Sequence, residues 1–175
     1  MYNNEFSYVS KPRNKAAKYV LMGLAGSALI FVVLANLTPK YSGLVWMVAF
    51  AFIVASIYVY NRYVGAEFCY SVESVDVLSF IVTQRVGKTV RTMARLDVSA
   101  IIEVRAMSGE EYRKYKCDKD VAKYSYFPTM FPKTLYLVRV RSHFEKADVF
   151  IESNADFALA LKNATKRATE GYDPY

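Results

Sequence analysis

The chain contains very little histidine and cysteine, and this scarcity excludes most residue sets used in catalysis and metal binding. Of 175 residues, one is histidine, His143, and two are cysteine, Cys69 and Cys117. A single histidine builds neither a serine-type triad nor a histidine-rich metal site, and the cysteines lack CxxC spacing. The 7 glycines form no phosphate-binding loop. We therefore expect no enzymatic activity, no cofactor and no metal.

Charge is missing from two long stretches near the N-terminus. Residues 19–37 and 42–60 contain no Asp, Glu, Lys or Arg, and only residues 38–41 separate them. A helix of about 20 residues reaches roughly 30 Å, which is the thickness of the hydrocarbon core of a bilayer. The pattern predicts a transmembrane helical hairpin over residues 19–61.

Two other interpretations of the apolar stretches are weaker. Buried core helices of a soluble protein are usually shorter, and the rest of the chain is too short to cover two such helices on all sides. A cleaved signal peptide has a shorter apolar region, and residues 35–37 are a poor small-residue cleavage site. The lack of charge inside the stretches also argues against an ion or proton path.

Basic residues before the first stretch predict the orientation of the hairpin. They are Lys11, Arg13, Lys15 and Lys18. The turn between the stretches has only Lys40, so the positive-inside rule places the basic arm 1–18 and the C-terminal domain in the cytoplasm. This predicts a two-pass protein of the inner (cytoplasmic) membrane with both termini cytoplasmic. In that compartment Cys69 and Cys117 remain thiols.

Small residues in the two stretches predict close packing of helices. Small-xxx-small pairs allow two helices to approach each other closely. The residues concerned are Gly23, Gly26, Ser27, Ala51 and Ala55. Two uses stay open, namely packing of the hairpin against itself and packing against another membrane subunit.

After residue 65 the hydrophobic pattern changes from helical to alternating. Residues 67–73 alternate apolar and polar side chains, which is the period of a strand. Further strands are predicted at 77–85, 89–96, 100–107, 124–127, 134–141 and 147–151. A helix capped by Ser153 or Asn154 follows and runs to about residue 169. Residues 65–171 therefore form one α+β domain with mainly antiparallel strands and a C-terminal helix.

Three features of this order carry a resemblance to a known family. A strand (67–73) follows directly on the second stretch, a Leu-Asp-Val-Ser-x-Ile turn (96–101) precedes the fourth strand, and a strand and helix (149–161) end the domain. The pattern, over most of residues 43–170, resembles the bacterial pleckstrin-homology-like (PH-like) domains carried on paired transmembrane helices. The resemblance implies a small, partly open β-barrel closed at one end by the helix. The charged segment 108–133 departs from the family pattern.

Four basic residues mark the second predicted hairpin of the domain: Arg85, Lys88, Arg91 and Arg95. Arg91 and Arg95 are four residues apart, so we expect them on one face of a strand. Eukaryotic relatives of the resembled fold bind inositol phosphates near an early hairpin, so the resemblance implies a headgroup site here. A basic residue near an anionic leaflet contributes about 1 kcal/mol to membrane binding. General contact with the leaflet and an ordinary solvated face are the alternatives.

Aromatic residues gather in the charged segment 108–133. They are Tyr112, Tyr115, Tyr124, Tyr126, Phe127 and Phe131, together with Met130. Either they pack beneath the loop as a small separate cluster, or they form a surface of the kind enriched at protein interfaces. The sequence leaves both interpretations open.

These observations predict a non-enzymatic, membrane-anchored PH-like interaction or scaffolding module, a subunit or accessory factor of a membrane protein complex. Its expected partners are the lipid bilayer and a membrane or cytoplasmic protein. The alternative function is an anionic-lipid-sensing PH-like domain. The net charge of +7 is spread along the chain, which argues against nucleic-acid binding. The oligomeric state stays open.

Overall fold

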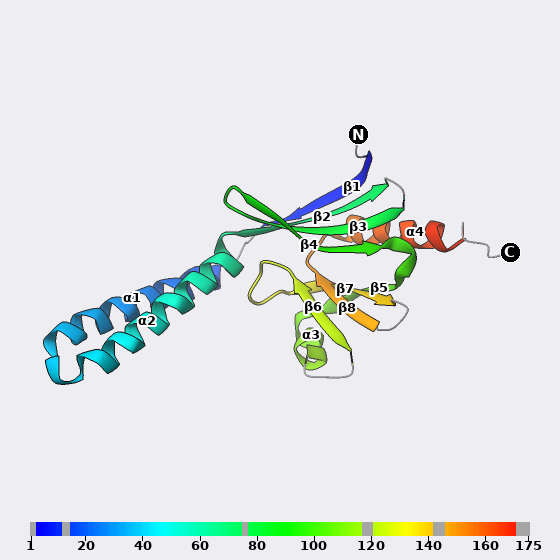
Figure 1. The fold of residues 1–175 in the computed structure, drawn as a ribbon. Coiled ribbons are helices and arrows are strands. Elements are labelled where there is room, and N and C mark those ends of the chain that lie inside the picture. Colours follow the sequence, from blue (N-terminus) through cyan, green and yellow to red (C-terminus); the bar gives the residue numbers. More distant parts are fainter. Residues whose placement is uncertain (1–2, 12–14, 75–76, 117–120, 142–145, 171–175) are drawn as a thin grey trace.

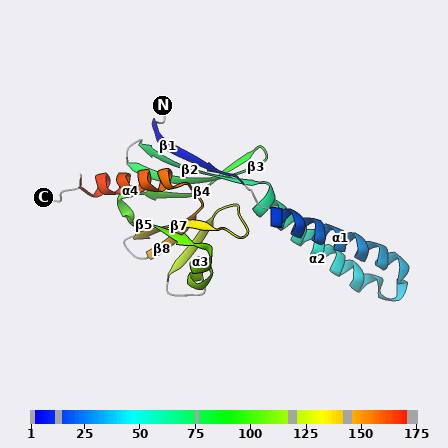
Figure 2. The same ribbon diagram turned by 180° about the vertical axis from the view of Figure 1, so that it is seen from behind.

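Two long helices project from one end of a β domain in the computed structural model, which describes residues 3–11, 15–74, 77–116, 121–141 and 146–170 (Figure 1). The domain consists of two four-stranded sheets, a short helix and a C-terminal helix. Seen from behind, the helix pair again stands clear of both sheets (Figure 2). We call the side of the domain from which it projects the helix-proximal end.

The helix pair has the length and composition needed to cross a membrane. Helix α1 (Lys15–Leu37) is followed by a 3₁₀ turn, η1 (Pro39–Tyr41), and then by α2 (Ser42–Val59). A π-helical turn, η2 (Tyr60–Val64), ends the pair. Apart from a few small residues at their contact, both helices have exposed or half-exposed side chains, which leaves their apolar surface without a protein cover.

The two helices meet along one seam. Its fully buried members include Ala17, Ala28 and Ala35 on α1 and Ala49 on α2. Ring contacts extend the seam, because Phe31 stacks on Phe52 with 5.5 Å between their centroids. Half-buried and buried positions recur at three- and four-residue steps on both helices, the repeat of left-handed helix packing.

The small residues singled out in the sequence lie mostly outside this seam. Ser27 and Ala55 are half-buried, whereas Gly23, Gly26 and Ala51 are exposed. A Cβ atom built on either glycine would meet no other atom within 4 Å. Packing of the hairpin against itself therefore does not use Gly23, Gly26 or Ala51, because the buried repeat falls on neighbouring alanines. Packing against another membrane subunit stays a prediction.

The first sheet contains an N-terminal strand that was not expected. Its order is β1 (Asn3–Ser10), β2 (Ala66–Ser74), β3 (Leu78–Val86) and β4 (Thr89–Asp97), with all neighbours antiparallel. Residues 3–10 of the predicted basic arm 1–18 therefore form a strand of the domain. Because β1 pairs with β2 along its whole length, the helix pair is the connection between two neighbouring strands.

The second sheet has the order β5 (Ile101–Ser108), β7 (Thr134–Arg141), β8 (Lys146–Ile151) and β6 (Ala122–Tyr126). Strand β6 runs parallel to β8, whereas the other pairs are antiparallel, so the strands are mainly antiparallel, as predicted. A 3₁₀ turn, η3 (Val98–Ala100), leads from the first sheet to the second. Helix α3 (Gly109–Lys116) follows β5.

The last helix closes the core between the sheets. Helix α4 (Ala155–Glu170) begins after Asn154, whose Oδ1 accepts a hydrogen bond from the backbone N–H of Phe157 at 2.9 Å, so Asn154 is the cap. The helix contacts β1, η3 and β5. Its Phe157 and Leu161 are buried with side chains from both sheets. The architecture is thus two open sheets and a C-terminal helix.

Candidate functional site

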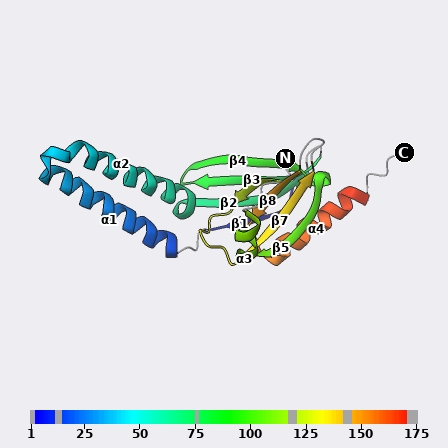
Figure 3. The same cartoon turned by 90° about the horizontal axis from the view of Figure 1, so that it is seen from below.

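The β3–β4 hairpin reaches beyond the rest of the first sheet toward the base of the helix pair (Figures 1 and 3). Its two-residue turn is Gly87-Lys88, and Gly87 has a φ of 59°. A positive φ at the first turn position alone is the geometry of a type II′ turn, which needs glycine there. The turn brings Arg85, Lys88 and Arg91 to the helix-proximal end, and we call these three residues the basic tip.

A β-bulge separates Arg95 from the basic tip. The register between β3 and β4 shifts by one residue at Met93. Arg95 lies opposite Ile81, whereas Arg91 lies opposite Gln84. Residues directly opposite each other on paired strands share a face. Ile81 and Gln84 are three positions apart on β3, so they lie on opposite faces of the sheet, and so do their partners. The expectation that Arg91 and Arg95 share one face is therefore wrong, because the bulge changes the alternation.

Two shallow hollows lie where the hairpin meets the base of the helices. One, of about 300 Å³, is lined by Arg91, Gln84 and Asn61 among others. The other, of about 450 Å³, is lined by Lys11, Arg85, Glu67 and residues of η2. Chain segments before α1, after α2 and in the β3–β4 hairpin thus meet at one surface. Its charged groups are mostly basic.

Arg62 fastens the end of the helix pair to the domain. Its guanidinium donates a hydrogen bond to the backbone carbonyl of Ser125 and lies 5.2 Å from the ring centroid of Phe68. The Tyr70 hydroxyl donates to the carbonyl of Tyr126, and the Tyr126 hydroxyl donates to that of Met93 at 3.4 Å. Burial raises the pKa of Tyr70 and Tyr126, so both hydroxyls remain protonated donors.

Three of the seven residues in the predicted interaction surface pack inside the domain. Tyr112, Tyr115 and Phe127 form a cluster with Phe150 on the outer face of the second sheet. The ring centroids of Tyr112 and Phe150 are 4.9 Å apart, and those of Tyr112 and Phe127 are 5.5 Å apart. These three residues therefore pack together as a small separate cluster and are not available as a binding surface.

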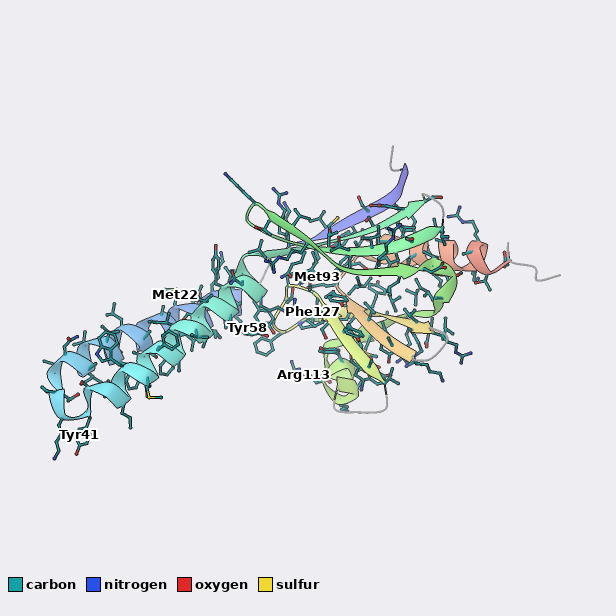
Figure 4. The ribbon with its side chains drawn as sticks, viewed as in Figure 1. Met22, Tyr41, Tyr58, Met93, Arg113 and Phe127 are labelled. Atoms are coloured by element: carbon teal, nitrogen blue, oxygen red, sulfur yellow. The ribbon has the colours of Figure 1, made fainter. Side chains whose placement is uncertain are left out.

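The other four residues remain at least partly accessible. Tyr124 and Phe131 are 49% and 58% exposed, and Tyr126 and Met130 are half-buried. The loop 127–133 reaches toward the base of the helices, and Phe127 and Tyr58 lie on facing sides of this region (Figure 4). The exposed part of the aromatic set is thus smaller than the sequence suggested.

Helix α3 begins with a reciprocal pair of hydrogen bonds. The N–H of Glu111 donates to the Ser108 hydroxyl at 3.2 Å, and the N–H of Ser108 donates to the Glu111 carboxylate at 2.8 Å. These bonds lower the pKa of Glu111. Ser-x-x-Glu is the sequence signature of such a capping box, so this signal could have predicted helix α3.

A close backbone contact joins α3 to the loop 127–133. The N–H of Gly109 donates to the carbonyl of Lys133 at 3.0 Å. A Cβ atom built on Gly109 would lie 2.0 Å from the carbonyl oxygen of Pro132. Only glycine permits this approach.

A row of alternating charges crosses the second sheet. Glu103, Arg139, Asp148 and Lys123 occupy directly opposite positions on β5, β7, β8 and β6. Arg139 Nε donates to Asp148 Oδ1 at 2.9 Å, and its Nη1 lies 3.4 Å from Glu103. We call these four residues the charge ladder. No local pattern in the sequence indicates the charge ladder, because its four residues are far apart in the chain.

Tyr115 of α3 binds the centre of the charge ladder. Its hydroxyl donates to Asp148 and accepts from Arg139 Nη2 at 2.7 Å, and Lys123 donates to its carbonyl at 2.7 Å. Burial by itself would raise the pKa of Asp148, but the hydrogen bonds from Arg139 and Tyr115 prevail and lower it. Asp148 is fully buried. The ladder therefore holds α3 on the sheet and presents no reactive group.

The described part of the chain contains no cluster of three or more His, Cys, Asp or Glu residues suited to a metal ion. Burial raises the pKa of the Cys69 thiol, which keeps it protonated. Cys117 and His143 lie outside the described residues.

Comparison of the chain with family models, curated proteins and solved structures finds no match. The candidate site is defined by its geometry: it is the helix-proximal end, with the basic tip, the hollows beside it and the loop 127–133.

Proposed function

We propose that the protein is a non-enzymatic, membrane-anchored PH-like interaction module, a subunit or accessory factor of a complex in the inner membrane. The observation that carries the proposal is the position of the helix pair between β1 and β2. Only residues 11–14 separate β1 from α1, and only Gly65 separates η2 from β2. An inserted helix pair would hold the helix-proximal end of the domain against the membrane surface.

The side chains of the helix pair support insertion. Tyr41 lies at the tip of the pair and Tyr58 near its base (Figure 4), and both are exposed. Tyr58 follows Tyr41 by 17 positions, which correspond to about 26 Å of helix, close to the thickness of a hydrocarbon core, and tyrosine favours its two boundaries. The basic residues before the first apolar stretch support a cytoplasmic domain, and the pairing of β1 with β2 supports placement of both termini on that side.

The accessible aromatic residues support a protein partner. Tyr124 is exposed on β6, the edge strand of the second sheet, and Phe131 is exposed in the loop 127–133 that follows β6. Met130 lies in that loop as well. Large aromatic side chains frequently carry most of the binding energy at protein interfaces.

Purification of the tagged full-length chain from its native membrane in mild detergent, followed by mass spectrometry, tests this proposal. We expect a stoichiometric protein that is lost from the Phe131→Ala and Tyr124→Ala variants. The matched control is Leu159→Ala, because Leu159 is 59% exposed on α4, away from this surface. Recovery of the chain alone, or equal capture by all variants, would contradict the proposed interaction surface.

Anionic-lipid sensing is a second candidate, and the position of the basic tip favours it. Arg85, Lys88 and Arg91 lie at the end of the domain that would face the leaflet. The bulge provides a matched pair of variants, since Arg95 lies on the other face, and its partner Ile81 is three positions, or about 10 Å, further along the sheet than Gln84, the partner of Arg91. We expect Arg91→Glu to reduce the anionic lipid retained by the purified full-length protein, more strongly at low salt, and Arg95→Glu to have little effect. Equal effects would exclude a specific role of the tip.

A fragment comprising residues 66–175 is not suitable for these tests. It would lack β1, which pairs with β2 along its whole length. The full chain is therefore used throughout.

A further inference from the structure

A third hollow at the helix-proximal end has a composition that differs from the basic tip. It measures about 740 Å³ and lies between the end of β1, the loop 127–133 and the chain entering α4. Its charged and aromatic lining residues are Tyr8, Lys11, Phe131, Lys133 and Glu152. Binding sites for small ligands have volumes of roughly 300–1,000 Å³, so the hollow has room for a polar headgroup.

Glu152 is the unusual member of this set. One carboxylate oxygen, Oε2, is buried and has no hydrogen-bond partner among the described residues. Burial raises the pKa of the Glu152 carboxyl, because the charged form loses part of its solvation. A buried acceptor without a donor is costly, and an ammonium group held beside the carboxylate would offset part of this cost through its opposite charge.

The two lysines provide the opposite charge. Lys11 follows β1 by one residue and Lys133 precedes β7 by one, and both line the same hollow. No salt bridge within 4.0 Å joins either of them to Glu152 among the described residues. A hollow with two ammonium groups and one carboxylate suits a ligand that carries both a phosphate and an amine.

The position of the hollow indicates where such a ligand comes from. Lys11 lies four residues before α1, and it lines the hollow beside η2 as well. Phe131 adds an apolar, exposed ring to the wall, which suits contact with the glycerol and acyl part of a lipid. A headgroup at the membrane surface is therefore the nearest source.

We propose that this hollow binds the headgroup of an aminophospholipid, with the phosphodiester at Lys11 and Lys133 and the primary ammonium at Glu152. The proposal rests on the proposed membrane anchoring. A headgroup without an amine leaves the Glu152 carboxylate without an ionic partner. A quaternary ammonium carries no N–H group and makes no hydrogen bond to it.

Native mass spectrometry of the delipidated full-length protein in mild detergent tests the proposal. Phosphatidylethanolamine, phosphatidylcholine and phosphatidylglycerol with identical acyl chains are added separately. We expect one molecule of phosphatidylethanolamine to bind to each protein, with an affinity at least tenfold higher than that of phosphatidylcholine or phosphatidylglycerol. In Glu152→Gln this preference should disappear, and in Lys133→Gln the affinity for phosphatidylethanolamine should fall.

Glu110→Gln is the matched control, because Glu110 is an exposed carboxylate on α3 and is not among the lining residues of the three hollows described at the helix-proximal end. We expect it to retain the preference for phosphatidylethanolamine. An unchanged preference in Glu152→Gln, or tighter binding of phosphatidylglycerol by the wild type, would overturn the proposal. Thermal unfolding of each variant confirms that a loss of binding does not reflect unfolding.

Two further measurements separate the source of the ligand from the anchoring. Soluble glycerophosphoethanolamine is added as a competitor, and we expect only weak displacement of the lipid. Displacement at equal concentration would assign the hollow to a soluble ester and overturn the lipid source. Resistance of the protein to alkaline extraction from membranes tests the anchoring by itself, and release would refute the proposed function without deciding whether the hollow binds the soluble ester.

Discussion

The two sheets of the domain use basic residues in opposite ways. In the second sheet, Arg139 and Lys123 lie in the charge ladder beside a fully buried carboxylate. In the first sheet, Lys88 and Arg91 are exposed at a hairpin tip. All the described salt bridges belong to the second sheet.

This difference separates charge that stabilises the fold from charge that is available to a ligand. A buried charge needs a partner, and the pair then restrains the elements that carry it. An exposed charge at the end of a hairpin contributes little to stability and can interact with whatever the domain faces. The helix pair connects two strands of the first sheet. The exposed basic residues at the tip of that sheet therefore lie at the helix-proximal end.

Breaking the charge ladder should give the largest loss of stability. In Asp148→Asn, Arg139 and Tyr115 lose their ionised acceptor. We expect a loss of about 2–3 kcal/mol in the free energy of unfolding, below the full value for a buried pair because Arg139 is partly exposed. Thermal unfolding of the full-length protein in detergent measures it as a fall in Tm of roughly 2–4 °C per kcal/mol.

Glu103→Gln is the control for that variant. Glu103 is 39% exposed and lies 3.4 Å from Arg139, so we expect a loss below about 1 kcal/mol.

The pKa of Asp148 is lowered in the folded state, so its contribution is complete at neutral pH. It should be lost only when the pH falls below about 4 and through the lowered pKa. Equal losses in the two variants would contradict the ladder's importance.

Gly109→Ala should have the next largest effect. The new Cβ atom would meet the backbone oxygen of Pro132 at 2.0 Å, so the loop 127–133 must move. We expect a cost of about 1–3 kcal/mol and faster hydrogen exchange in that loop. For Gly87→Ala, which has a positive φ but open space around it, we expect about 1 kcal/mol and a change confined to the β3–β4 turn. If either variant showed faster hydrogen exchange both in the loop 127–133 and in the β3–β4 turn, the expectation of local effects would be wrong.

Glu152→Gln should stabilise the protein at neutral pH. Burial raises the pKa of Glu152 in the folded state, so the ionised side chain opposes folding above that pKa. This cost disappears below the unfolded value of about 4.3. We therefore expect a gain of about 1 kcal/mol or less at pH 7.5, and none at pH 4, from thermal unfolding at the two pH values. A loss of stability at pH 7.5 would show that the carboxylate is compensated.

Neutralising the basic tip should have the smallest effect on stability. For Lys88→Gln and Arg91→Gln we expect changes within about 0.5 kcal/mol, because both side chains are exposed. The measurement is thermal unfolding beside the Asp148→Asn variant. A loss comparable to that variant would remove the distinction between the two sheets.

Most elements of the fold could be predicted from local patterns. The two apolar stretches are helices, and the predicted strands from 67–73 to 147–151 all exist with ends within about two residues of those expected. Asn154 caps α4 as one of two predicted alternatives. Each of these features depends on side-chain period or turn chemistry within one segment.

The features that sequence reasoning missed depend on partners far along the chain. Strand β1 pairs with β2, which begins more than fifty residues later in the chain. The bulge at Met93 depends on the register with β3, and the parallel pairing of β6 depends on β8. No local pattern reports such pairings.

The sequence by itself determined where the apolar helices and the strands lie, because hydrophobic period and turn residues act over a few positions. Only the tertiary structure decided which charged and aromatic residues are buried. Tyr112 and Asp148 were removed from the surface by α3, and Arg91 was separated from Arg95 by one inserted residue in a strand. The reason is physical: burial and facing depend on which strands pair and in what register, and distant segments decide that together.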